Sequence, residues 1–199
     1  FKWIARQIRL NEGIKKYIGG GEESYGFLAE DFVRDKDAVS ACSLLAEICA
    51  WAKDQGKTLY DILMDIYMEY GFAYNKAISV VKPGKTGADE IKAMMESFRA
   101  NPPKELAGSP IVEVKDYKAL KAYDAQGAAT DIDMPETSNV IQWFAQDRTM
   151  VSIRPSGTEP KIKFYIEVRG TLSSPKDYEA VTAAAEKKVD AIKKSIGLD

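Results

Sequence analysis

The 199-residue sequence contains no histidine, and this absence excludes several kinds of catalytic site. Without an imidazole there is no Ser-His-Asp or Cys-His arrangement, and no metal site that depends on a histidine ligand. Any proton transfer must therefore use a lysine, a carboxylate or a tyrosine.

Cysteine is scarce. Cys42 and Cys49 are the only two, and they lie in a segment with helical periodicity. About two turns apart on one helix face, they are too distant for a disulfide within that helix. We predict two buried free thiols, which is typical of a reducing compartment.

Long apolar runs and a strong net charge are also missing. No stretch approaches the length needed to cross a bilayer, and the first residues, Phe1-Lys-Trp-Ile4, lack the apolar core of a secretory signal. A formal net charge of -2 gives no broad basic surface for DNA or RNA. We expect a cytoplasmic protein without a membrane or nucleic-acid partner, in which any anion site is local.

The first seventy residues have mainly helical periodicity, with glycines where two of the helices should end. The chain begins on a helix pattern without a capping residue, which suggests truncation. One strand cannot form a sheet alone, so we expect the other strands of its sheet to be missing. Helices are predicted over residues 1–18, 37–55 and 58–70, and a strand over residues 17–21.

The remaining residues read as a compact α+β domain, an antiparallel sheet with helices on one face. The clearest strand spans residues 162–168, where apolar and polar residues alternate strictly. The polar segment 117–138 is predicted to be a loop. Other strands are predicted over residues 73–81, 110–114, 140–144 and 149–153, and helices over 86–100 and 174–196.

Between two of these strands, Arg154-Pro-Ser-Gly-Thr-Glu-Pro160 gathers groups that grip a phosphate dianion. Arg154 can donate two parallel hydrogen bonds, the hydroxyls of Ser156 and Thr158 can donate as well, and Gly157 permits close backbone approach. Lys163 adds charge nearby, either for phosphate or as a solvated surface lysine. The simpler alternative is a tight turn in which Ser, Gly and Thr serve only turn geometry.

A second loop, Gly21-Glu-Glu-Ser24, carries carboxylates and a hydroxyl after a strand. Glu22 can accept from neighbouring sugar hydroxyls and Ser24 can donate or accept, although an exposed acidic loop is the simpler alternative. The segment Arg34-Asp-Lys-Asp37 is typical of a helix cap with surface ion pairs. The two loops would hold opposite ends of a sugar phosphate, because carboxylates do not attract phosphate.

Taken in order, Gly21-Glu-Glu-Ser-Tyr-Gly26, Arg34-Asp-Lys-Asp37 and Arg154-Pro-Ser-Gly-Thr-Glu-Pro160 resemble the α-D-phosphohexomutase superfamily, especially its phosphoglucomutase and phosphomannomutase branch. The resemblance covers nearly the whole chain. It implies the end of an α/β third domain over residues 1–71 and a complete α+β fourth domain over residues 72–199.

The resemblance also implies roles for individual residues. The sugar loop contacts hydroxyls and sets specificity through Glu22 and Ser24. The fourth-domain loop holds the phosphate that is not transferred, through Arg154, Ser156, Gly157 and Thr158. Lys36 is the candidate for proton transfer or a phosphate contact.

By the same resemblance, the intact protein would be an intramolecular phosphotransferase. It would interconvert hexose 1-phosphate and hexose 6-phosphate through an enzyme phosphoserine and a hexose 1,6-bisphosphate, with Mg2+. Neither the serine segment nor the aspartate-rich metal loop occurs in this chain, so we expect no metal ligands here and no activity from the chain without its N-terminal domains. Two alternatives stay open: a non-catalytic sugar-phosphate-binding module, and a mutase for mannose, pentose or amino-sugar phosphates.

Overall fold

The structure, a computed structural model, divides into two compact units, Phe1–Asp65 and Ile66–Asp199. The division falls inside helix α3 (Leu59–Tyr70), and each unit is treated by itself. The described residues are 1–22, 25–84 and 86–198.

The first unit contains helix α1 (Lys2–Leu10) and a short hairpin of β1 (Gly19–Gly21) and β2 (Phe27–Ala29). The two strands pair antiparallel, with Gly20 opposite Leu28. The sequence predicts one strand without a partner and a first helix reaching residue 18, and both predictions are wrong. Strand β2 is too short for a period of two to be recognised, and turns replace the helix after Leu10.

Helix α2 (Ala38–Asp54) begins as predicted, because Asp37 accepts hydrogen bonds from the N–H groups of Val39 and Ser40. Helix α3 begins with a reciprocal cap. The Thr58 N–H donates to the Asp61 carboxylate at 2.8 Å, and the Asp61 N–H donates to the Thr58 hydroxyl at 3.2 Å.

The prediction of buried thiols on α2 is wrong, since Cys42 and Cys49 are both exposed. The same helix exposes 77% of Val39 and 54% of Trp51. An apolar helix face predicts burial only where another element covers it, and within the described residues this face is largely uncovered.

The second unit is built on an antiparallel sheet in the order β3-β10-β9-β8-β5-β6-β7, with β4 paired to β5. Its strands are β3 (Phe72–Val81), β4 (Glu105–Leu106), β5 (Ser109–Asp116), β6 (Lys121–Asp124), β7 (Ala129–Asp131), β8 (Ile141–Ala145), β9 (Met150–Pro155) and β10 (Lys161–Gly170). Its helices are α4 (Gly87–Ala100), the short 3-10 helix η1 (Pro175–Asp177) and α5 (Tyr178–Ser195).

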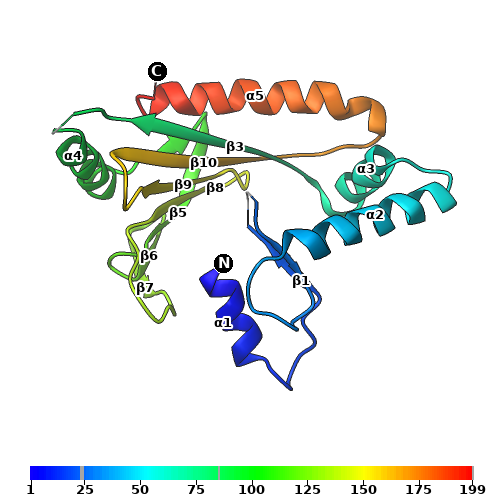
Figure 1. Ribbon diagram of the computed structural model, residues 1–199. Coiled ribbons are helices and arrows are strands. Elements are labelled where there is room, and N and C mark those ends of the chain that lie inside the picture. The colour runs from blue at the N-terminus through cyan, green and yellow to red at the C-terminus, as the bar shows by residue number, and fades with distance from the viewer. Residues whose placement is uncertain (23–24, 85, 199) are drawn as a thin grey trace. The chain divides into compact units, whose positions relative to one another are not determined.

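Strand β10 lies between β3 and β9 (Figure 1). Its predicted alternation of buried and more exposed side chains is confirmed. The side chains that it buries share one face. Helix α4 packs there through Phe98, whose ring meets the rings of Phe164 and Trp143 edge to face at 6.0 and 5.4 Å. Helix α5 also contacts β10 and buries Val189 and Ile192.

Residues 117–138 are not a loop throughout, which corrects the prediction for this segment. Strands β6 and β7 lie within it and extend the sheet to its far edge. Strand β7 has three residues, all exposed, so it has no apolar alternation that a sequence pattern could detect.

Candidate functional site

The predicted phosphate loop leaves the end of β9 and enters β10, so the ladder between these strands fixes its two ends. In that ladder Arg154 lies directly opposite Lys163. Ile153 and Phe164 form the next pair, and both are fully buried on the face that α4 covers. Because successive side chains of a strand alternate between faces, Arg154 and Lys163 share the opposite face of the sheet.

This pair of cations is unusual, because like charges directly opposite each other destabilise a sheet. In the part of the chain that the structure describes, neither Arg154 nor Lys163 forms an ion pair. The Lys163 ammonium lies 5.9 Å from the centre of the Tyr165 ring, and the Glu159 carboxylate interacts with it only through its charge, without an ion pair. A bound dianion would relieve this repulsion.

The carboxylate nearest in sequence to this pair is already engaged. Glu159 accepts a hydrogen bond from the ammonium of Lys161, and this bond lowers the pKa of Glu159. The charge of Lys163 contributes a smaller part to the lowered pKa of Glu159. Glu159 is therefore paired with Lys161, while Arg154 and Lys163 have no ion-pair partner among the described residues.

The backbone of the loop is held at several points. The Ser156 N–H donates to the carbonyl of Lys161 at 2.8 Å, and the Lys82 N–H donates to the carbonyl of Pro160 at 2.9 Å. The Ser156 hydroxyl also accepts a hydrogen bond from the Thr158 N–H at 3.4 Å. Ser156 therefore does stabilise the turn, as the tight-turn alternative proposes.

Gly157 does not fit the tight-turn alternative. Its φ is outside the left-handed region, and a Cβ added there would meet no atom within 4 Å. The fold itself therefore does not require glycine at this position. Close approach of a ligand to the backbone would require it.

The sugar loop predicted in the first unit is closed by a hydrogen bond of 2.7 Å from the Glu22 N–H to the Gly26 carbonyl. Ser24, the second predicted sugar contact, lies outside the described residues, as does Glu23. Tyr25 is fully exposed with φ at +57°, a conformation that costs free energy for a non-glycine residue.

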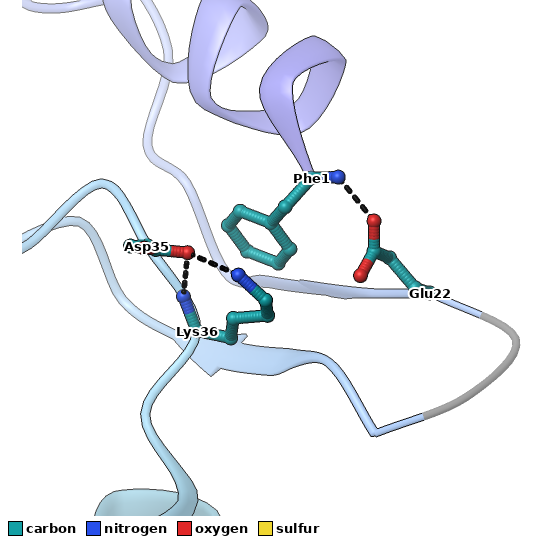
Figure 2. A network of polar contacts seen from close by, with 4 residues as sticks. All are labelled: Phe1, Glu22, Asp35 and Lys36. Atoms are coloured by element: carbon teal, nitrogen blue, oxygen red, sulfur yellow. Dashed lines mark hydrogen bonds and ion pairs between the residues drawn. The ribbon is translucent and has the colours of Figure 1, made fainter. Parts of the chain in front are cut away.

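Figure 2 shows Glu22 and Lys36 near one another, together with Asp35 and Phe1. A Cβ at Gly26 would lie 2.6 Å from the Glu22 carboxylate and 3.1 Å from the Lys36 side chain. Glycine at this position therefore allows the two predicted site residues to approach each other. The Glu22 carboxylate also accepts from the amino group of Phe1.

The electrostatic surroundings of Lys36 favour its charged form. The hydrogen bond of 2.7 Å to Asp35 is the largest cause that raises the pKa of Lys36, and the charge of Glu22 adds to it. A lysine with a raised pKa is protonated at neutral pH, so it can donate a proton or hold an anion but cannot accept a proton.

The interpretation of Arg34-Asp-Lys-Asp37 as a cap with ion pairs is also supported. Asp37 caps α2, and Arg34 forms an exposed ion pair of 2.6 Å with Glu12. Sequence reasoning missed the roles of Asp35 and Gly26. The spacing from Gly21 to Gly26 can be read from the sequence. The approach of Glu22 and Lys36 at Gly26 cannot, because it depends on how the hairpin and the segment before α2 fold together.

Two further features bear on function. Within residues 1–22, 25–84 and 86–198, no group of three or more His, Cys, Asp or Glu residues is placed to hold a metal ion. No helix in that part of the chain is long and apolar enough to span a membrane.

Comparison with known proteins identifies two regions of the chain. Residues 1–70 match the family model for phosphoglucomutase/phosphomannomutase, alpha/beta/alpha domain III. Residues 99–185 match the model for phosphoglucomutase/phosphomannomutase, C-terminal domain. Together with the antiparallel sheet and its helices, these matches confirm the predicted fold class, the end of an α/β third domain followed by an α+β fourth domain.

The relatives include bacterial phosphoglucomutases. The phosphoglucomutase of Staphylococcus haemolyticus (strain JCSC1435) is 40% identical over 169 residues, which are 84% of this chain and 30% of that protein. The phosphoglucomutase of Staphylococcus aureus (strain MRSA252) is 41% identical over 170 residues, covering 85% of this chain and 30% of that protein. The chain thus spans about 30% of the length of the curated relatives that it matches.

A solved structure shares the fold. The crystal structure of the exocytosis-sensitive phosphoprotein pp63/parafusin, a phosphoglucomutase from Paramecium in an open form, matches with a TM-score of 0.56 at 16% identity. The match covers 96% of this chain and 33% of that one. The chain belongs to the phosphoglucomutase/phosphomannomutase family of the α-D-phosphohexomutase superfamily, and it corresponds to the C-terminal part of such a protein.

Proposed function

We propose that this chain supplies the sugar- and phosphate-binding parts of a phosphohexomutase that interconverts hexose 1-phosphate and hexose 6-phosphate. The observation that carries the proposal is the pair of cations Arg154 and Lys163, which lie opposite each other beside the Ser156–Thr158 loop. This arrangement suits a terminal phosphate, and the family matches indicate which reaction would use it.

In the proposed reaction, a phosphoserine of the intact enzyme transfers its phosphoryl group to a sugar hydroxyl and forms a bisphosphate. The bisphosphate turns end over end, and its other phosphoryl group returns to the serine. This chain would hold the phosphate that is not reacting at each step. The positions that we assign to this role are Arg154, Ser156, Gly157, Thr158 and Lys163.

Glu22 and Ser24 are proposed to bind sugar hydroxyls between the two reactive ends of the substrate. Lys36 is proposed to remain protonated and to contact a phosphate or donate a proton, because Asp35 and Glu22 raise its pKa. The proposed domains are residues 1–71 and 72–199, and the proposed compartment is the cytoplasm.

Magnesium, which the family resemblance implies, would assist phosphoryl transfer when bound. The described residues do not fit such a site, since they bring no metal-binding group of side chains together. We assign no step of this chain to the metal, and we propose that the chain alone does not turn over substrate.

The binding role is tested by titrating the 199-residue chain with glucose 6-phosphate, free glucose and inorganic phosphate while backbone amide shifts are followed by NMR. We expect both phosphate-bearing ligands to shift Gly157 and Thr158, and Arg154→Ala to abolish these shifts. Arg148→Ala, an exposed arginine at the other end of β9, is the matched control. A folded sample in which no phosphate ligand shifts the loop would contradict the proposal.

A second measurement distinguishes the proposed function from its two alternatives. A non-catalytic binding module would bind sugar phosphates, yet the intact protein would show no mutase activity. A mutase for mannose, pentose or amino-sugar phosphates would be active, with a higher kcat/KM for one of those substrates than for glucose 1-phosphate. Assays of the intact protein with each substrate therefore decide among the three.

A further inference from the structure

The antiparallel sheet of the second unit has two unlike edge strands, β7 and β3 (Figure 1). Strand β7 has three residues, and its Asp131 forms an ion pair with Lys121 of the neighbouring strand. Strand β3 has ten residues without proline or glycine, and it pairs with β10 along its full length without a bulge. Short or charged edge strands prevent pairing between molecules, whereas long regular ones permit it. Strand β3 is therefore the edge that is open to another strand.

The register of β3 and β10 shows which backbone groups of β3 point outward. The Lys82 N–H donates to the Pro160 carbonyl at 2.9 Å, so the backbone groups of Lys82 point towards β10. Because this direction alternates along a strand, the even-numbered residues of β3 bond to β10 and the odd-numbered residues point away from it. Among the described residues, no backbone group pairs with the N–H or carbonyl of the outward residues, which are Ala73, Asn75, Ala77, Ser79 and Val81.

The helices of the second unit cover a face of the sheet and leave this edge open. Tyr74 and Ile78 lie on the same face as Phe164, against which α4 packs. The Tyr74 hydroxyl donates to Glu186 of α5 at 3.1 Å, and α5 contacts both β10 and β3, so α5 lies on that face as well. A further strand can therefore be added beside β3 in the plane of the sheet.

A second copy of β3 is complementary to this edge. When two identical strands pair antiparallel about a two-fold axis, one position lies at the axis. If that position is Ala77, Asn75 faces Ser79 of the second copy and Ala73 faces Val81, so that all five outward residues form hydrogen-bonded pairs. The Val81 side chain, which is 60% exposed, would then be covered in part by Ala73 of the second copy.

Charge favours this register over the one centred on the preceding residue. Lys76 is the single charged residue of β3. A pairing centred on Lys76 would place two ammonium groups directly opposite each other, which destabilises a sheet. A pairing centred on Ala77 places Lys76 opposite Ile78 of the second copy. It also places Tyr74 opposite Val80, and such aromatic and β-branched pairs stabilise antiparallel strands.

We propose that β3 is a dimerisation edge, at which two copies of this chain pair antiparallel about Ala77 and join their sheets into one continuous sheet. The inference does not depend on the proposed phosphate site, because none of the outward residues of β3 belongs to that site.

Sedimentation equilibrium of the 199-residue chain tests the dimer, for which we expect a dissociation constant of about 100 μM or below. Ala77→Lys should weaken the dimer at least about tenfold, because the two introduced ammonium groups face each other across the axis. Asn75→Lys is the matched control. It adds the same charge to the same face of β3 but opposite Ser79, so it should weaken the dimer much less. Both positions are exposed, and circular dichroism checks that both variants fold.

A cross-link tests the register itself. In a chain with Cys42→Ser and Cys49→Ser, Ala77→Cys should form a disulfide-linked dimer on mild oxidation, since hydrogen-bonded partners lie about 5.5 Å apart at Cα. Asn75→Cys should not, because its two copies would be about 13 Å apart along the strands.

Three results would overturn the inference. They are a chain that stays monomeric well above about 100 μM, a dimer that Ala77→Lys and Asn75→Lys weaken equally, and a dimer that Ala77→Cys does not cross-link. A dimer that forms instead through the exposed face of α2 would be insensitive to Ala77→Lys, and it would equally overturn the proposal.

Discussion

The two units of the chain differ in how firmly they hold their candidate loops. In the second unit the phosphate loop joins two central strands above a core that fully buries Trp143 and Phe164. In the first unit the sugar loop joins two three-residue strands, and the described apolar side chains that are buried are only Ile8, Leu28, Ala52 and Met64.

This difference has a consequence for recognition. A site on a rigid scaffold loses less conformational entropy when a ligand binds, so the phosphate loop is suited to anchor a substrate. A loop on a sparsely packed scaffold depends more on local contacts, such as those that meet across Gly26. We therefore expect substitutions in the second unit to act through stability and phosphate affinity, and those in the first unit to act locally.

The largest effect is expected from Phe164→Ala. Phe164 is fully buried and meets Phe98 edge to face, so its truncation should cost about 3–5 kcal/mol of unfolding free energy. Urea unfolding followed by circular dichroism measures this cost. Val112→Ala, on strand β5 but 40% exposed, should cost about 1 kcal/mol or less. Equal losses for the two variants would show that the sheet is not the rigid scaffold described.

A pair of glycine substitutions compares the two loops directly. Gly157→Ala introduces a Cβ that meets no protein atom, so folding should be unchanged. Its phosphate affinity should fall about tenfold, because the methyl group obstructs the backbone N–H. Gly26→Ala should leave phosphate affinity unchanged and shift the amides around Glu22 and Lys36, where the new Cβ collides. Normal phosphate binding by Gly157→Ala would show that the phosphate does not approach the backbone at Gly157.

The pH dependence of the second unit provides a smaller effect. Burial alone would raise the pKa of Asp147, but hydrogen bonds from Lys188 and Thr149 outweigh it and lower that pKa to about 2. The stabilisation is thus present above the unfolded pKa of about 4 and is lost as pH falls towards 2. Since 42% of the Asp147 side chain is exposed, solvent screening limits the contribution to about 1 kcal/mol.

Unfolding of Asp147→Asn and the unsubstituted chain should therefore differ at pH 7 and converge near pH 2. Asp133→Asn, which removes an exposed carboxylate elsewhere in the second unit, serves as the control and should not change this profile. A difference that persists unchanged through acid pH would mean that the charge of Asp147 is not its cause.

The smallest effect concerns Lys36 in the first unit. Its raised pKa depends chiefly on the hydrogen bond from its ammonium to Asp35, so Asp35→Asn should lower that pKa. Side-chain NMR shifts of Lys36 followed through alkaline pH measure the change. The same titration of Lys121, whose pKa is raised by its hydrogen bond to Asp131, should be unaffected. An unchanged Lys36 pKa would show that Asp35 does not raise the pKa of Lys36.

In the second unit, periodicity in the sequence was sufficient to predict a helix or strand wherever one face of that element is buried. The alternation from Ile162 to Val168 predicted β10, and the cap at Ser174 predicted where the last helix region begins. Strands β6 and β7 escaped detection because they are short and mostly polar. The face shared by Arg154 and Lys163 follows from register, which separate strand predictions do not provide.

The first unit was harder to predict, for a physical reason. Its helices α2 and α3 were predicted from caps and periodicity, both of which are local properties. Whether Cys42 and Cys49 are buried is not a local property, because it depends on what covers the helix face, and both are exposed. The Gly26 contact likewise joins residues from the hairpin and from the segment before α2, so sequence spacing alone could not reveal it.

The most direct test of the phosphate assignment is the affinity of the 199-residue chain for inorganic phosphate, followed through the amides of Gly157 and Thr158. Arg154→Gln and Lys163→Gln should each weaken binding about tenfold or more, because both cations share the face beside the loop. Arg148→Gln should bind as the unsubstituted chain does. Unchanged phosphate affinity in both Arg154→Gln and Lys163→Gln would contradict the account.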